Sequence, residues 1–364
     1  MKKFLSFVLV LVMLAGVCAS FVSCADDPNT VVVCNWGEYI SDADDPEDSR
    51  IFNVIKKFEE ETGIKVKYVT CETNEELYST MKAGGVAYDV IFPSDYMVQK
   101  MINENMVQKL NFDNIPNYKN VSTSEGELPS FKDMYYDPDN AYTVPYFWGT
   151  VGIIVNTKLY NGDWESLTWD DLWTDEYPNQ ILMFNNPRDA FAVALNKLGY
   201  SMNTTDENQI RQAAAELKKM KFNYVMDEFF QIVPENRAVL SVYYAGDYLD
   251  VASDNEDLEF VRPESGVNIF NDVMCVPSNA KHKENAEKFI NFMLREDVGL
   301  ANALALGYST PNTAVYAKLD EDIKEDEVAY PASIPSTWER FEALPEKTDK
   351  LIQDLWQEIL ISNT

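Results

Sequence analysis

The sequence predicts an α/β protein with two lobes, and three observations support this prediction. The chain has 364 residues, 46% of them hydrophobic, and this length favours two lobes over a single one. Over residues 31–102, runs of strand-forming residues alternate with amphipathic helical patterns. This β-α-β-α-β-α order favours a parallel sheet. A further set of strands and helices begins after residue 150, where we place the crossing into the second lobe.

The N-terminus carries a targeting segment. Lys2 and Lys3 precede a mostly apolar stretch, residues 4–17, which is short for a membrane-spanning helix. The sequence Phe21-Val22-Ser23-Cys24 then fits a lipobox, although Phe21 stands where leucine is usual. We therefore expect residues 1–23 to be a lipoprotein signal peptide, Cys24 to carry the lipid and residues 24–29 to be a tether. Ordinary secretion with cleavage nearby is the alternative.

The elements of the first lobe follow from its hydrophobic pattern. A buried strand at 31–33 breaks at Asn35 and Gly37, which are turn formers. We expect further strands at 64–68 and 89–92, and helices at 51–58, 74–83 and 97–102. Asn74 should cap the second of these helices, and the first two should end at glycines, Gly63 and Gly84. Residues 41–50 are acidic but fail the EF-hand pattern, so we expect a solvated loop.

The second half of the chain continues the alternation. Residues 111–143 are rich in Asn, Pro, Asp and Tyr and predict a long ordered loop. Strands are expected at 152–155, 181–184, 238–243 and 273–276, and helices at 191–198, 286–294 and 351–359. Trp169, Leu172 and Trp173 have helical spacing and are expected in the core. Phe270 and Asp272 are expected in a turn that precedes the strand at 273–276.

Charge and rare residues exclude several classes of function. The net charge of −30 argues against nucleic acid or an anionic membrane surface as a partner and favours cationic ligands. His282 is the only histidine and is expected in an exposed turn, so histidine-based metal sites and Ser-His-Asp triads lack a well-placed histidine. We expect no metal and no cofactor. Without Cys18 and Cys24, three cysteines remain, an odd number; we expect Cys34 and Cys275 to be buried thiols, and a Cys34–Cys71 bridge stays open.

Predicted strand ends carry aromatic and acidic side chains rather than basic ones. Ligands in open α/β sheets bind beyond the carboxyl ends of strands. The one arginine at these positions, Arg188, need not face a ligand. Aromatic faces attract an ammonium group, and carboxylates neutralise it, so this set predicts a flexible di- or triamine as ligand. The residues are Trp36, Glu38, Tyr39, Ser94, Tyr96, Asp189, Tyr244, Asp247, Phe270 and Asp272.

An ordered set of motifs over nearly all of the chain after the signal resembles the spermidine/putrescine-binding proteins of bacterial ABC importers. The motifs are Asn35-Trp36-Gly37-Glu38-Tyr39, Pro93-Ser94-Asp95-Tyr96, Val144-Pro145-Tyr146-Phe147-Trp148-Gly149, Trp169-Asp170-Asp171-Leu172-Trp173, Leu198-Gly199-Tyr200-Ser201, Asn203-Thr204-Thr205-Asp206, Ile290-Asn291-Phe292 and Gly307-Tyr308-Ser309-Thr310-Pro311-Asn312.

The resemblance implies a two-lobed, type II-like periplasmic binding protein fold with a mixed sheet in each lobe and a ligand cleft between the lobes. We expect residues 30–150 and 271–314 in the N-terminal lobe, and 151–270 and 315–364 in the C-terminal lobe. The family further implies a periplasmic protein that is not an enzyme and delivers a polyamine to an inner-membrane ABC permease. It implies no nucleic-acid partner, and we expect membrane contact only through the lipid anchor.

The resemblance also names ligand residues, with departures that leave the choice between putrescine and spermidine open. Matching positions are Trp36, Glu38, Tyr39, Ser94, Tyr96, Asp272 and Tyr308. At other positions this chain differs from the pattern of the spermidine-binding relatives. Gly37 stands where Thr is common, Asn186 stands where the family has Asp, and Asp189 stands in the place of the Glu that accompanies that Asp. Tyr244 and Phe270 each stand where the family has Trp, and Glu339 stands where it has Gln. The stretch ending at Asp247 looks like the putrescine-binding branch. We expect Asp272 to pair one ammonium, and Asp189, Asp247 or Glu339 to pair the other.

Three alternatives stay open at this point. A secreted glycoside hydrolase would also have an aromatic, acidic cleft, with Asp189 and Asp272 posing as its carboxylate pair. A protein of the same fold could bind another solute, such as another cation, an amino acid, a sugar or iron. A sensor or adhesin that responds to polyamines without transport would show the same site, since lobe closure serves both roles.

Overall fold

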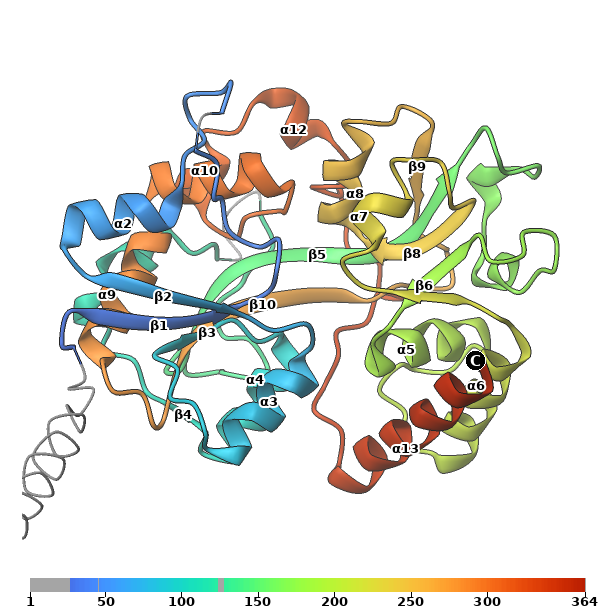
Figure 1. The fold of residues 1–364 in the computed structure, drawn as a ribbon, viewed down its shortest axis with the longest axis horizontal. Coiled ribbons are helices and arrows are strands. Elements are labelled where there is room, and N and C mark those ends of the chain that lie inside the picture. Colours follow the sequence, from blue (N-terminus) through green and yellow to red (C-terminus); the bar gives the residue numbers. More distant parts are fainter. Residues whose placement is uncertain (1–26, 45, 124–127, 364) are drawn as a thin grey trace, which may run out of the picture.

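The computed structural model describes residues 27–44, 46–123 and 128–363. Two α/β lobes lie side by side, and the long strands β5 and β10 run from one lobe into the other (Figure 1). The predicted signal peptide and Cys24 lie outside the described residues, as do residues 25 and 26 of the tether. Within the described part of the chain, no helix is both long and apolar enough to cross a membrane.

Within the described residues, ten strands form one continuous mixed sheet. Their order is β2-β1-β3-β10-β5-β8-β6-β7, with β4 paired to β10 and β9 paired to β5. The strands are β1 (Thr30–Asn35), β2 (Lys65–Thr70), β3 (Val90–Ile91), β4 (Val107–Gln108), β5 (Thr143–Asn156), β6 (Ile181–Phe184), β7 (Asn223–Val225), β8 (Leu240–Tyr244), β9 (Leu258–Val261) and β10 (Ile269–Pro277).

The pairing gives each lobe a parallel core with antiparallel neighbours. In the first lobe, β1 pairs in parallel with β2 and β3, and β10 runs antiparallel to β3. In the second lobe, β6 pairs in parallel with β7 and β8, while β5 runs antiparallel to β8 and β9. Strands β5 and β10 pair antiparallel with each other where they join the lobes. The expected mixed sheet and two-lobed fold are confirmed.

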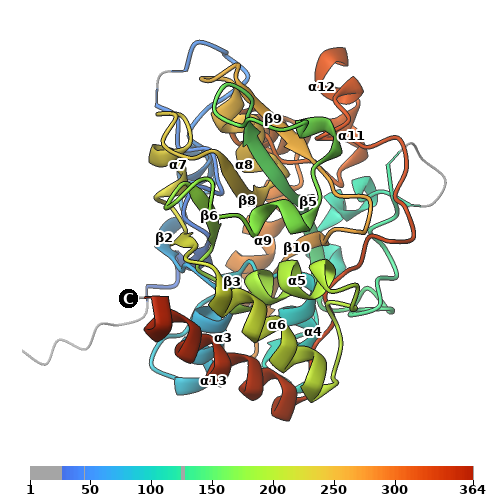
Figure 2. The same cartoon turned by 90° about the vertical axis from the view of Figure 1, so that its right-hand side faces the viewer.

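Helices cover both faces of the sheet in each lobe. They are α2 (Val54–Thr62), α3 (Asn74–Ala83), α4 (Asp95–Asn103), α5 (Pro187–Lys197), α6 (Glu207–Lys219), α7 (Phe229–Ile232), α8 (Ala245–Ala252), α9 (Lys283–Met293), α10 (Glu296–Leu306), α11 (Thr313–Tyr316), α12 (Glu321–Glu325) and α13 (Glu346–Asn363). Short 3₁₀ segments lie at Phe112–Asn114, Pro116–Asn120, Trp164–Ser166 and Trp169–Leu172. Helix α13 packs on α5 and α6 at the outer end of the second lobe (Figure 2).

Two hydrophobic clusters divide along the lobes. One joins the second-lobe strands to α5, α6 and α13, and another joins the first-lobe strands to α2, α9 and α10. A third cluster holds Cys34, Leu77 and Met97 beneath the sheet of the first lobe and also includes Phe341. Val315 and Leu319 pack with the first-lobe cluster, whereas the N-terminal lobe is expected to end at residue 314. The expected division of the chain between the two lobes stays a prediction.

Glycine signals placed the C-terminal ends of two helices in the first lobe correctly. Gly63 and Gly84 end α2 and α3 with φ angles of 70° and 71°, the left-handed conformation that favours glycine. The expected cap of α3 is wrong by one residue: the Thr73 side chain accepts a hydrogen bond from the Glu76 amide. Asn74 is the first helical residue, and its side chain instead bonds to Ser94.

Three expectations about local environment need correction or completion. Phe270 and Asp272 do not precede a strand, because β10 already begins at Ile269. His282 is partly buried rather than exposed: Asp89 lies 3.0 Å from its Nδ1 and accepts a hydrogen bond from its backbone amide. Six helices were not predicted: α6, α7, α8, α10, α11 and α12. Cys34, Cys71 and Cys275 are all buried free thiols, so Cys34 and Cys71 are not bridged in this structure.

Candidate ligand site between the lobes

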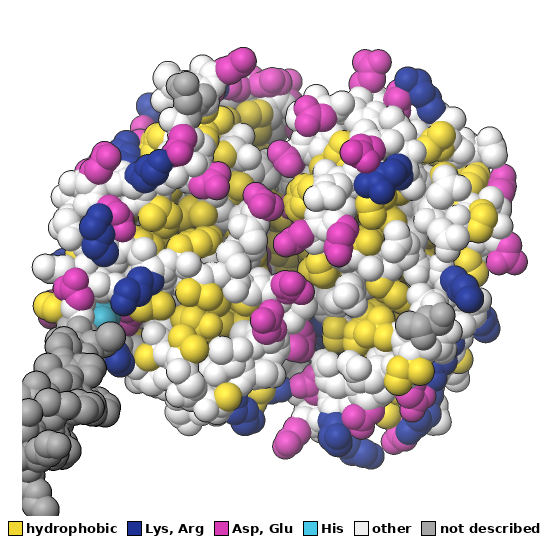
Figure 3. Space-filling model, in the orientation of Figure 1, with side chains coloured by type: hydrophobic (Ala, Val, Ile, Leu, Met, Phe, Trp, Pro, Cys, Tyr) yellow, Lys and Arg dark blue, Asp and Glu magenta, His cyan; other side chains and the backbone are white. Residues whose placement is uncertain are grey.

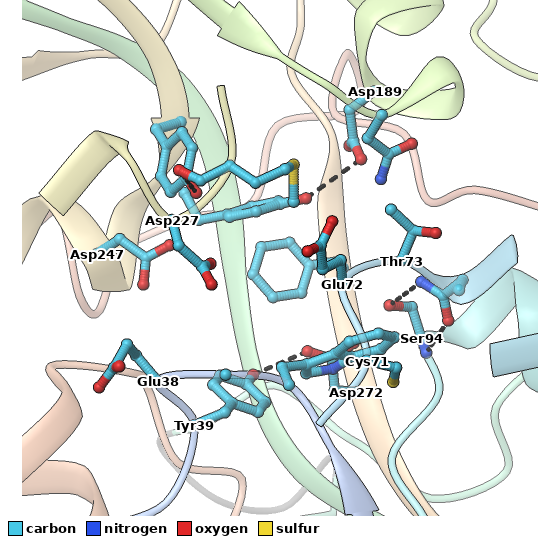
Figure 4. Close-up of a pocket in the computed structure, with 18 of the residues that line it drawn as sticks. Glu38, Tyr39, Cys71, Glu72, Thr73, Ser94, Asp189, Asp227, Asp247 and Asp272 are labelled. Atoms are coloured by element: carbon cyan, nitrogen blue, oxygen red, sulfur yellow. Dashed lines mark hydrogen bonds between the residues drawn. The ribbon is translucent and has the colours of Figure 1, made fainter. Parts of the chain in front are cut away.

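A cavity of about 280 Å³ lies between the lobes, and acidic side chains gather along both sides of the groove that separates them (Figure 3). Thirteen of the fourteen residues predicted as ligand contacts line it: Trp36, Gly37, Glu38, Tyr39, Ser94, Tyr96, Asn186, Asp189, Tyr244, Asp247, Phe270, Asp272 and Tyr308. Side chains from both lobes point into this space (Figure 4).

Glu339 is the predicted residue that the structure places elsewhere. It does not line the cavity, and its carboxylate accepts hydrogen bonds from Ser201 at 2.6 Å and Asn203 at 3.4 Å. Glu339 lies in the segment that follows α12, and its backbone forms an isolated parallel β-bridge with Asn268. The structure therefore does not place Glu339 among the residues that line the cavity, and its Oε2 is engaged within the second lobe.

Asp272 lines the cavity at a bulge in β10. The register against β5 shifts between Asn271 and Val273, and Asp272 forms an isolated bridge with Ser94. The Tyr39 hydroxyl donates to Asp272 Oδ2 at 2.8 Å, while Oδ1 has no hydrogen-bond partner among the described residues. Burial raises the pKa of Asp272 to about 6, because a charged carboxylate is costly away from water.

Two more buried carboxylates face Asp272 from the second lobe. Asp189 lies in the first turn of α5 and accepts from the Tyr244 hydroxyl at 3.2 Å. Asp247 lies in the first turn of α8 and accepts from the Tyr308 hydroxyl at 2.9 Å. Helix N-termini favour negative charge. Burial nevertheless prevails and raises the pKa of Asp189 to about 7 and that of Asp247 to about 8.

Aromatic rings form the walls between these carboxylates. Tyr244 and Phe270 meet edge-to-face with centroids 5.3 Å apart, and Tyr39 meets Tyr308 at 4.8 Å. Trp36 is half-buried at the end of β1 and completes the first-lobe side. Rings of this kind bury methylene groups and attract cations, so the cavity suits an alkyl chain with cationic ends.

No lysine, arginine or histidine of the described chain lines the cavity. Arg188, the one basic residue at the predicted strand ends, is buried beside it. Its guanidinium donates to Asn203 and to the Glu342 carbonyl, and it lies over the ring of Phe341 at 4.5 Å. The three buried carboxylates therefore face a space that supplies them with hydroxyl donors but no cation.

Several lining residues were missed from the sequence. Asp227, Glu72 and Glu76 add exposed carboxylates at the rim, and Phe230 and Phe341 add aromatic surface. Asp227 follows the short strand β7, which carries only three residues and gave no recognisable pattern. Cys71, Thr73 and Asn74 reach the cavity from the turn between β2 and α3. Within the described chain, no group of three or more His, Cys, Asp or Glu side chains is arranged to hold a metal ion.

Gly246 allows Tyr308 to cross from the first lobe to Asp247. A Cβ atom at Gly246 would lie 2.5 Å from the Tyr308 ring, so we expect Gly246→Ala to destabilise the protein by about 1–3 kcal/mol. Denaturant unfolding measures this change. The control is Gly85→Ala, which adds a methyl group to open space. Equal stability of the two variants would contradict this packing.

A cavity formed by two α/β lobes joined by crossing strands, with ligand-facing side chains from both, defines the class of two-lobed solute-binding proteins. The chain matches the family model described as bacterial extracellular solute-binding protein over residues 53–332, and it belongs to this family. It is 37% identical to the spermidine/putrescine-binding periplasmic protein of Salmonella typhimurium over 312 residues, which cover 84% of each chain. The expected resemblance is thus confirmed.

Solved structures agree with this assignment. A Listeria monocytogenes protein, provisionally described as a spermidine/putrescine ABC transporter, superposes with a TM-score of 0.83 at 36% identity. That alignment covers 92% of this chain and 99% of the Listeria chain. The spermidine/putrescine ABC transporter substrate-binding protein PotD of Streptococcus pneumoniae gives 0.71 at 35% identity, with the same coverage.

Proposed function

We propose that this protein binds a polyamine, putrescine or spermidine, between its lobes. The observation that carries the proposal is the set of three buried carboxylates, Asp189, Asp247 and Asp272, at most 8% exposed, in an aromatic cavity that no basic side chain of the described chain lines. The relatives whose names include spermidine and putrescine support the same ligand class.

The roles of the residues follow from their positions. Asp272 pairs one ammonium group through Oδ1, the oxygen left without a partner. Asp189 or Asp247 pairs the other from the second lobe. Trp36, Tyr244 and Phe270 enclose the methylene chain, and the Tyr39, Ser94, Tyr96 and Tyr308 hydroxyls complete the hydrogen bonds. Each ammonium then relieves the cost of a buried carboxylate, so attraction and desolvation favour the same ligand.

The protein is also proposed to deliver its ligand to an ABC permease and to act without catalysis. Its localisation follows from the predicted lipobox: a lipid on Cys24 holds it on the outer side of a bacterial cytoplasmic membrane. We expect Cys24→Ser to remove the added acyl mass, because the side chain that carries the lipid is gone. Intact-mass measurement of the membrane-bound wild-type protein and of the variant tests this. A wild-type protein without acyl mass on Cys24 would contradict the anchor.

A thermal-shift comparison of ligand classes tests the proposed function. The protein is unfolded and refolded to remove carried-over ligand, then exposed to putrescine, spermidine, an amino acid, a sugar and ferric ion. We expect stabilisation by the polyamines alone, since ligands that bind only the native state raise the unfolding temperature. Stabilisation by a sugar with turnover of a glycoside would instead support the hydrolase alternative. Co-purification of a polyamine permease would favour transport over sensing.

Asp227 provides a test of chain-length preference. Its exposed carboxylate lines the main cavity and also a second pocket at the cleft mouth with Glu38 and Asp250. A third ammonium reaches this rim, whereas a diamine is held by the deeper carboxylates. We expect Asp227→Asn to weaken spermidine binding by about threefold, the size of an exposed ion pair, and to leave putrescine binding unchanged. Calorimetry with both ligands measures the ratio, and an equal loss for both would contradict this role.

A further inference from the structure

Arg188 is a buried arginine for which the proposed binding of a polyamine has no use. It lies in the first turn of α5, is 5% exposed and directly precedes the cavity residue Asp189. Its guanidinium donates to Asn203 Oδ1 at 2.8 Å and to the Glu342 carbonyl at 3.1 Å. Its Nε has no hydrogen-bond partner among the described residues. These contacts leave the positive charge beside neutral acceptors, next to a cavity that is proposed to bind a cation.

The ring of Phe341 lies between this guanidinium and the cavity. Phe341 lines the cavity and is 3% exposed, whereas Arg188 is not among the residues that line it. The guanidinium carbon lies 4.5 Å from the centroid of the Phe341 ring, which is a cation–π contact. It also lies 5.6 Å from the ring centroid of Tyr96, a second residue that lines the cavity. Two rings of the cavity wall thus contact the charge that the cavity lacks.

Phe341 is held in this position by its ring and by its backbone. The ring meets Tyr96 of α4 edge-to-face, with centroids 5.6 Å apart. The Phe341 carbonyl accepts a hydrogen bond from the Tyr135 hydroxyl. Two residues further on, the Ala343 amide donates at 2.7 Å to Gln99 Oε1, which also lies in α4. The ring therefore forms a fixed part of the cavity wall.

The guanidinium would change the selectivity of the cavity if it faced the ligand. A guanidinium presents a planar fork of donors that suits a carboxylate, and at short range it repels an ammonium group. Burial lowers the pKa of Arg188, but an arginine keeps its charge at neutral pH. A cavity that included both Arg188 and Asp272 would therefore suit an ammonium group at one end and a carboxylate at the other, which is the chemistry of an amino acid.

We propose that Phe341 is a specificity-determining residue, whose ring keeps the Arg188 guanidinium out of the cavity and so reserves the cavity for dications over amino acids. This role rests on the proposed function, because selection among ligands requires that the cavity bind a polyamine. The ring lines the cavity and contacts the guanidinium, so its removal joins the vacated space to the cavity and brings Arg188 to the ligand.

Labelling with phenylglyoxal, which condenses with accessible guanidinium groups, tests the position of the ring without any polyamine. The full chain is purified in mild detergent, and labelled peptides are quantified by mass spectrometry. We expect Arg188 to react at least about tenfold faster in Phe341→Ala than in the wild-type protein, because a buried group reacts only after local opening. The exposed Arg237 should react equally in both proteins.

Two further variants separate removal of the ring from a general loosening of the protein. Phe230→Ala removes another phenylalanine that lines the cavity, from α7, and should leave Arg188 protected. Phe341→Leu fills part of the same space and should give an intermediate rate, and it replaces Phe341→Ala if the alanine variant does not fold. The proposal is overturned if Arg188 reacts as fast as Arg237 in the wild-type protein, or stays protected in the folded Phe341 variant.

Calorimetry with two four-carbon ligands measures selectivity. Putrescine has an ammonium group at each end, whereas 4-aminobutanoate has one ammonium group and one carboxylate. We expect the wild-type protein to prefer putrescine. We expect Phe341→Ala to lower the ratio of the two affinities by at least about 30-fold, since the uncovered guanidinium attracts one ligand and repels the other. Arg188→Gln in the Phe341→Ala background should restore the ratio, which a merely structural loss would not do.

The outcomes separate this role from the proposed function. If the wild-type protein binds neither putrescine nor spermidine, the proposed function fails and the selectivity role fails with it, whereas labelling still decides whether Phe341 covers Arg188. If the wild-type protein binds putrescine and Phe341→Ala weakens both ligands equally, the selectivity role alone is overturned. Equal affinity of the wild-type protein for putrescine and 4-aminobutanoate would overturn it as well.

Discussion

Replacing Asp272 by asparagine is expected to lower polyamine affinity by about 100-fold or more, which is the largest single effect in the site. Asparagine keeps the shape and still accepts from the Tyr39 hydroxyl, but it cannot neutralise an ammonium group. The cation would then be buried beside a neutral amide, and an unpaired buried charge costs several kcal/mol. Calorimetric titration with putrescine measures the loss.

The matched control is Glu339→Gln, which removes a carboxylate that does not line the cavity. We expect its affinity to change by less than about twofold, because its partners Ser201 and Asn203 remain within the second lobe. Unchanged affinity in Asp272→Asn, or an equal loss in both variants, would contradict the assigned role of Asp272. The unfolding midpoint of each variant shows whether a loss reflects folding.

Affinity is expected to rise steeply with pH between about 5 and 8. Burial raises the pKa values of Asp272, Asp189 and Asp247 to about 6, 7 and 8, so at pH 5 the ligand-free site is largely protonated. Alkyl ammonium groups keep their charge over this range, with pKa values near 10. Binding must therefore expel protons at low pH. Ionising Asp272 costs about 10-fold in affinity at pH 5 and ionising Asp189 about 100-fold, so affinity weakens on the order of 1,000-fold from pH 8 to pH 5.

Stability of the ligand-free protein should follow the opposite trend. Because these pKa values lie above the unfolded value of about 3.9, the native state holds extra protons between about pH 4 and 8. The binding of these extra protons stabilises the native state fully below pH 4, and this stabilisation is lost as the pH rises through the native pKa values of 6 to 8. The thermal shift caused by putrescine should accordingly be larger at pH 8 than at pH 5.5. A pH-independent affinity without proton release would contradict these assignments.

Sequence reasoning found most of the site because its residues follow clear local signals. Trp36, Glu38 and Tyr39 come directly after a β-branched strand, and Asp189 and Asp247 begin helices at strand ends. The same rule located Ser94 and Tyr96. The rule also pointed to Asp272, which lines the cavity, but it placed this residue before its strand. A bulge in β10, which no local pattern reveals, lies at this position.

The remaining differences come from long-range packing. Asp227 and Phe341 reach the cavity from a weak strand end and from a segment between helices α12 and α13, so neither has a periodic signal. Glu339 lies close to Phe341 in sequence, yet its carboxylate turns to Ser201.

The most direct test of the central claim is calorimetry on the refolded, ligand-free protein with three four-carbon compounds: putrescine, 1-aminobutane and 1,4-butanediol. They share the alkyl chain and differ in the number of ammonium groups. Charge pairing at both ends of the cavity predicts saturable binding of putrescine that weakens with salt. It also predicts binding of the monoamine at least about 100-fold more weakly and no detectable binding of the diol. Absence of putrescine and spermidine binding, or equal binding of the diol, would contradict the polyamine site.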